Sequence, residues 1–151
     1  MNVKNPRLAY REAAVQSASS VELVIMLYDM LIEDIRGAID ALRENNVEKR
    51  GEELKHGMLV LQQLQGSLDF EQGGEAAVGL ERFYTMVRGK LMEAHLKSSL
   101  ELMGEQIRLL LEVRDAWRES AKQSQAGRED RPAIVPLPVE PELIAANGWS
   151  A

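Results

Sequence analysis

Two histidines, His56 and His95, are the side chains best suited to metal or acid–base chemistry in this sequence. Glu53 and His56 have the Glu-x-x-His spacing found in di-metal sites of helical bundles. Such a site needs two of these pairs, and Met92 stands three residues before His95, where the second glutamate would be. The sequence also contains no cysteine, which excludes thiolate nucleophiles and Cys-based metal centres. We therefore expect no metal site and no cofactor.

Serine and glycine motifs of catalytic sites are missing as well. No serine stands in a Gly-x-Ser-x-Gly turn, which would present it as a nucleophile. No glycine-rich loop is followed by Lys-Ser or Lys-Thr, the pattern that cradles phosphates. We expect no catalytic residue, and the sequence does not predict an enzyme.

Composition narrows the remaining classes of protein. The chain has 151 residues, of which 45 % are hydrophobic and 28 % charged, so it can form a real core. A net charge of −6 makes nucleic acid an unfavourable partner. No apolar run approaches the ~20 residues that cross a bilayer, and the amino terminus has no apolar signal-peptide stretch. We expect a cytoplasmic protein without stable membrane insertion.

The apolar pattern predicts an all-α fold, because straight-chain helix formers are abundant and aromatic residues make up only 5 %. Apolar residues recur at helical spacing over about 19–44, 47–68, 75–96 and 98–123. Serines three residues before glutamates predict capping boxes at Ser19 and Ser98. The short connections predict an antiparallel up-down four-helix bundle.

Three regions are expected along the chain. Residues 1–18 are a short docking segment, residues 19–125 form the bundle, and residues 126–151 form a proline-rich tail without helix, expected to be mostly disordered. The apolar pairs Ile134-Val135 and Leu143-Ile144 are either a short docking motif or part of a solvated terminus.

Several helices carry more apolar residues than one core-facing stripe requires. Residues off the predicted core lines either fill the bundle or line an outer groove for a partner helix. The groove hypothesis assigns this role to Leu59, Val60, Phe83, Met86, Leu102, Leu109 and Val113.

An ordered series of short segments resembles the FliS family of flagellar export chaperones. The resemblance covers about residues 5–117, and its segments follow in the family's order and spacing. They are Asn5–Tyr10, Ala18–Leu23, Met26–Asp29, Leu68-Asp69 before Gly73–Glu75, Leu80 before Phe83-Tyr84, and Leu109–Val113 before Arg114–Trp117. Ser20, Met30 and Arg7 depart from the family's usual residues.

The resemblance implies a four-helix chaperone that binds the disordered carboxy-terminal segment of flagellin, prevents its premature polymerisation and delivers it to the flagellar type III export gate. It also implies that Tyr10 covers the client groove and contacts an export gate component, with Leu8 beside it. Two alternatives remain: a helical adaptor that self-associates, for example as a homodimer, and a metal-binding bundle.

Overall fold

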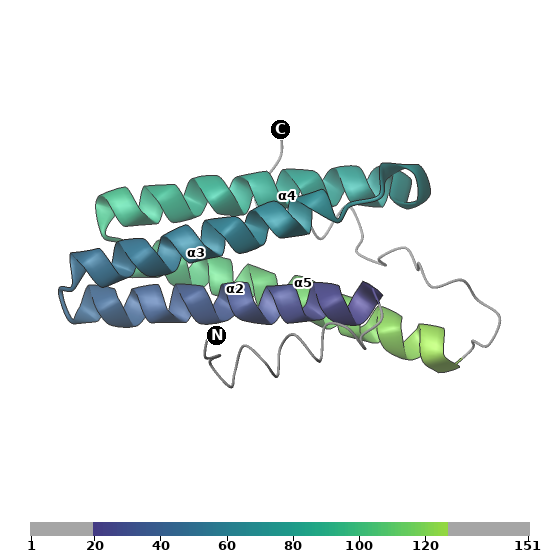
Figure 1. The fold of residues 1–151 in the computed structure, drawn as a ribbon, viewed down its shortest axis with the longest axis horizontal. Helices are drawn as coiled ribbons and strands as arrows, with labels where there is room; N and C mark the ends of the chain where they lie inside the picture. The colour runs from purple at the N-terminus through teal and green to yellow at the C-terminus, as the bar shows by residue number, and fades with distance from the viewer. Residues whose placement is uncertain (1–19, 127–151) are drawn as a thin grey trace, which may run out of the picture.

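A computed structural model describes residues 20–126, with side chains up to residue 123. These residues form α2 (Ser20–Arg43), α3 (Val47–Gly66), α4 (Phe70–Lys97) and α5 (Leu100–Ala126). Each helix runs opposite to the one before it, and α2 packs against α5 as well as α3, which closes the bundle (Figure 1). The predicted all-α four-helix bundle is confirmed for the described residues. None of these helices is long and apolar enough to span a membrane.

Asn46 caps the start of α3. The side chain of Asn46 accepts a hydrogen bond from the backbone N–H of Lys49 at 3.0 Å, which satisfies one of the free donors of the first helical turn. Ser19, the predicted cap of α2, lies outside the described residues.

The helix predicted at 75–96 begins earlier, at Phe70. Asp69 accepts hydrogen bonds from the N–H groups of Glu71 and Gln72, so it starts a helical turn before the glycine pair. Gly74 then interrupts this helix with φ 53° and ψ −127°, a backbone conformation that other residues rarely adopt. The predicted turn at the glycines is therefore a kink within α4.

The predicted cap at Ser98 is wrong by one residue. Ser98 ends α4 in the left-handed conformation, with φ 51°. The hydroxyl of Ser99 instead accepts from the N–H of Leu102 at 3.1 Å and caps α5.

The core contains mostly aliphatic side chains from all four helices, with three aromatic rings in its centre. The rings belong to Tyr28, Phe83 and Tyr84, which are all buried. The hydroxyls of Tyr28 and Tyr84 lie 2.8 Å apart and form a hydrogen bond between α2 and α4. This contact gives each of the two buried hydroxyls a hydrogen-bond partner.

The Tyr28–Tyr84 pair provides a stability prediction. Replacing either tyrosine with phenylalanine leaves the other hydroxyl buried without this partner, so each single variant should lose about 1–3 kcal/mol of unfolding free energy. The Tyr28→Phe/Tyr84→Phe double variant should lose less than the two single losses combined, because no buried hydroxyl is left behind. Urea unfolding of the four proteins measures this coupling. Additive losses would show that the hydrogen bond contributes nothing.

Helices α2 and α3 approach each other closely where glycine allows it. A Cβ atom added at Gly57 would lie 3.2 Å from Leu31 Cδ1, and one at Gly37 would lie 2.8 Å from Glu53 Cδ. The close approach fixes the relative position of the two helices whose outer faces form part of the candidate site.

Candidate functional site

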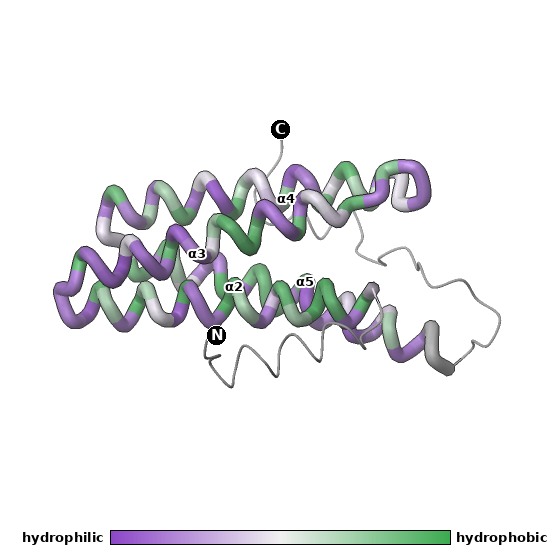
Figure 2. The backbone as a smooth tube through the Cα atoms, in the orientation of Figure 1, coloured by the Kyte–Doolittle hydropathy of each residue, from purple (hydrophilic) through white to green (hydrophobic). Residues whose placement is uncertain are grey.

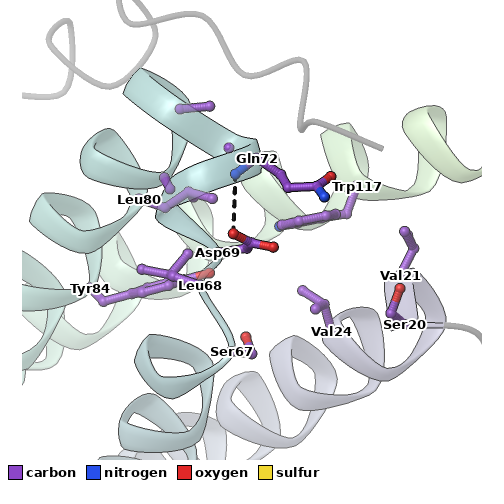
Figure 3. Close-up of a pocket in the computed structure, with 13 residues that line it drawn as sticks. Ser20, Val21, Val24, Ser67, Leu68, Asp69, Gln72, Leu80, Tyr84 and Trp117 are labelled. Atoms are coloured by element: carbon purple, nitrogen blue, oxygen red, sulfur yellow. Dashed lines mark hydrogen bonds between the residues drawn. The ribbon is translucent and has the colours of Figure 1, made fainter. Parts of the chain in front are cut away.

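An apolar pocket of about 120 Å³ opens at the end of the bundle where α2 begins. Its residues come from four places that are far apart in the sequence: the first turns of α2, the α3–α4 connection, α4 and α5 (Figure 3). We call it the Trp117 pocket. It is lined by Ser20, Val21, Val24, Ser67, Leu68, Asp69, Gln72, Gly73, Ala76, Ala77, Leu80, Tyr84 and Trp117.

The early start of α4 helps to form this pocket. Because Asp69 caps the helix, the turn at residues 70–73 stands over the end of the bundle, and Gly73 and Gln72 line the pocket. Trp117 of α5 also lines the pocket (Figure 3). The pocket therefore depends on the turn that the sequence prediction placed outside the helix.

Tyr84 lines the pocket, and its hydroxyl is hydrogen-bonded to that of the fully buried Tyr28. Burial, and then the neighbouring Tyr84, raise the pKa of Tyr28 well above its usual value, and burial likewise raises the pKa of Tyr84. The indole nitrogen of Trp117 faces Tyr28 and opposes part of that shift, although no hydrogen bond of standard geometry joins them. Both hydroxyls stay neutral, so the tyrosine pair adds no charge next to the pocket.

An ion pair beside the pocket joins α5 to α2. Arg114 Nη1 lies 2.7 Å from Asp29 Oδ1. The segments of the FliS resemblance that contain Tyr28-Asp29, Tyr84 and Arg114–Trp117 therefore meet in one place. These residues hold three helices together around the pocket.

A second, shallower hollow lies between the outer faces of α2 and α3. Met30, His56, Leu59, Val60, Gln62 and Gln63 line it. At its edge, His56 Nδ1 lies 2.6 Å from Asp34 Oδ2. Burial raises the pKa of Asp34, and its hydrogen bond with His56 opposes part of that shift. This contact fixes α3 against α2 at one border of the hollow.

A row of half-buried side chains on α2 connects the pocket with the hollow. Val24 lines the pocket, Met30 lines the hollow, and Leu27 lies between them. Residues three apart are neighbours on a helix surface, so the row is continuous. Hydrophobic residues are concentrated in this first half of α2 (Figure 2). We call Val24, Leu27, Met30 and Leu59 the apolar strip.

The structure divides the seven residues of the predicted groove into two groups. Leu59 is 55 % exposed, and Met86 and Leu102 are half-buried. The other four are at most 5 % exposed and belong to the core, so their predicted position outside it is wrong. These four are Val60, Phe83, Leu109 and Val113. Leu59 and Val60 both line the hollow, where Val60 contributes a buried edge.

The prediction also missed most of the residues that form the site. Val24, Leu68 and Trp117 line the Trp117 pocket, and none of them is among the seven residues predicted for the groove. Leu68 and Trp117 belong to segments that resemble the FliS family, and this resemblance was the signal in the sequence that could have identified them as site residues. Leu8 and Tyr10 lie outside the described residues. Among residues 20–123, no group of three or more metal-ligating side chains is found.

Exposed apolar side chains also occur at the opposite end of the bundle. Val47, Met92, Leu96 and Leu100 are all exposed there, and Leu96 reaches 81 %. None of these four side chains lines the Trp117 pocket or the α2–α3 hollow. This end therefore provides matched control positions for the apolar strip.

Comparisons with known proteins agree with this architecture. The family model described as "Flagellar protein FliS" matches residues 3–124. The chain is 28 % identical to the flagellar secretion chaperone FliS of Bacillus subtilis over 87 % of its length and 95 % of the relative's. It is 31 % identical to the Escherichia coli protein of that name, over 72 % of this chain and 81 % of the relative. Flagellar secretion chaperone FliSB of Pseudomonas aeruginosa is 30 % identical, over 70 % of this chain and 84 % of the relative.

Proposed function

The chain belongs to the FliS family of flagellar secretion chaperones, and we propose that its apolar strip binds the carboxy-terminal segment of flagellin. The chaperone acts in the cytoplasm, where it keeps flagellin from polymerising and delivers it to the flagellar type III export gate. The observation that carries this proposal is the continuous row from the Trp117 pocket to the hollow at Leu59.

A client without structure of its own must bury about 1,000–3,000 Å² to offset the entropy lost on ordering. A single pocket of about 120 Å³ cannot bury that area, whereas a strip along a helix seam can take an amphipathic client helix. Half-buried Met and Leu side chains suit this role because they adapt to the partner's shape. The site offers mainly apolar surface, which favours binding of an apolar client segment.

Co-purification with flagellin tests the proposal. Full-length flagellin should form a one-to-one complex with the chaperone, and flagellin lacking its carboxy-terminal segment should not. Light scattering then gives the mass of the complex. Equal recovery of both flagellins would overturn the proposed client segment. A homodimer that persists unchanged with client present would favour the self-associating adaptor.

We further propose that residues 5–16, including Leu8 and Tyr10, cover part of the strip when client is absent. The segment joins α2 at its first turn, beside the pocket. A client peptide should displace it, so proteolytic cleavage within residues 5–16 should become faster when a flagellin carboxy-terminal peptide is added. Equal cleavage rates with and without the peptide would contradict the covering role.

A further inference from the structure

The Trp117 pocket lies close to where the last helix ends. Trp117 is nine residues before Ala126, the last residue of α5, which corresponds to about 13 Å of helix. The carboxyl end of α5 and the amino end of α2 are at the same end of the bundle (Figure 1). A chain leaving α5 and turning back meets the pocket after a short distance.

The sequence beyond α5 contains an apolar proline-rich run at that distance. Residues 134–139 read Ile-Val-Pro-Leu-Pro-Val, without a charged or polar side chain. Residues 127–133 separate this run from α5 and span about 22 Å at the ~3.1 Å per residue of a polyproline II chain. That span exceeds the distance back along α5 to Trp117, so the run reaches the pocket without rearrangement of the bundle.

The chemistry of pocket and run also matches. Proline-rich segments bind grooves lined by aromatic and aliphatic side chains, because they enter already extended and lose little entropy. Here Trp117 provides the aromatic wall, and Val21, Val24 and Leu80 provide aliphatic ones. A pocket of about 120 Å³ has room for a leucine or proline side chain.

We propose that the Trp117 pocket binds residues 134–139 of the same chain, with Leu137 and its flanking prolines packed against Trp117. The amino-terminal segment is the rival occupant, but its residues next to α2, Ser17-Ala18-Ser19, are small and mostly polar, and residues 1–19 contain no apolar run comparable to 134–139. This inference goes beyond the proposed function, since the docked state needs no client.

Paramagnetic relaxation tests the proposal on the full chain. The protein has no cysteine, so Ala133→Cys introduces a single site for a nitroxide label. The label should cause loss of the methyl signals of Val21, Val24 and Leu68 in the pocket, while the methyl signals of Leu96 at the far end remain. Loss at both ends or at neither would overturn the proposal.

Two tail variants in the labelled protein identify the contact. Leu137→Ser should restore the pocket signals, whereas the matched Leu143→Ser, outside the run, should leave them lost. The opposite pattern would overturn the assignment to residues 134–139. Loss that appears only when labelled and isotope-enriched chains are mixed would show binding by a second copy.

A label at Ser17→Cys identifies the rival occupant. Loss of the pocket signals from this label alone, and not from Ala133→Cys, would assign the pocket to the amino-terminal segment and overturn the proposal. All measurements are made without flagellin, so their failure leaves the proposed client function standing.

Discussion

Replacing Leu59 with glutamate should weaken binding of the flagellin carboxy-terminal segment by about 10- to 100-fold. Leu59 is 55 % exposed at the α2–α3 hollow, so it has apolar surface left to bury against a client. A fully buried leucine side chain is worth about 1.5–3 kcal/mol, and a carboxylate in its place must also lose water on binding. The fold should remain intact, because the side chain already faces solvent. Calorimetric titration with the client peptide measures the change.

Leu96→Glu is the matched control for this experiment. Leu96 is also a leucine on a helix surface, 81 % exposed, but it lies at the opposite end of the bundle. The same charge change there should leave the client affinity nearly unchanged. Equal losses for the two variants would mean that added negative charge, and not the apolar strip, determines affinity.

Replacing Phe83 with alanine should lower the stability of the fold and leave the client affinity nearly unchanged, which is the opposite of the result expected for Leu59→Glu. Phe83 is fully buried and packs against Tyr84, with ring centroids 5.8 Å apart. Truncating a buried phenylalanine removes its transfer energy and leaves a cavity, which costs about 3–5 kcal/mol of unfolding free energy. Urea unfolding monitored by circular dichroism measures the loss.

Measuring client affinity distinguishes the loss of stability in Phe83→Ala from a direct role of Phe83 in client binding. In buffer without urea, where Phe83→Ala remains folded, its affinity for the client peptide should stay close to that of the natural protein. A large loss of affinity with little loss of stability would return Phe83 to the groove that the sequence predicted. Leu59→Glu and Phe83→Ala thus test surface and core independently.

The helices were predictable because their signals are local. Apolar spacing located all four. The helix boundaries that were predicted wrongly depend on which of several neighbouring residues caps the helix. Ser98 and Ser99 are both serines, and only the tertiary turn places Ser98 in the left-handed conformation and leaves Ser99 as the cap. Asp69 is a residue type that caps helices, but the two glycines that follow it indicated a turn instead of a helix start.

The groove was harder to predict because a helix in this bundle packs against two neighbours. Contacts on two sides widen the buried stripe beyond a single apolar line. Phe83 next to Tyr84, and Leu109 next to Leu110, are therefore buried as pairs. Leu59 lines the outer hollow with Met30 of α2 and stays exposed. Periodicity along one helix cannot tell these two cases apart, since the difference depends on packing between helices.

Hydrogen exchange of the full chain, with and without a flagellin carboxy-terminal peptide, tests the central claim most directly. The account predicts slower amide exchange over residues 24–30 of α2 and 56–63 of α3, the two segments that hold the apolar strip. Residues 92–100, at the other end of the bundle, should be unchanged. Protection confined to residues 92–100, or absent from α2 and α3 when client is bound, would contradict it.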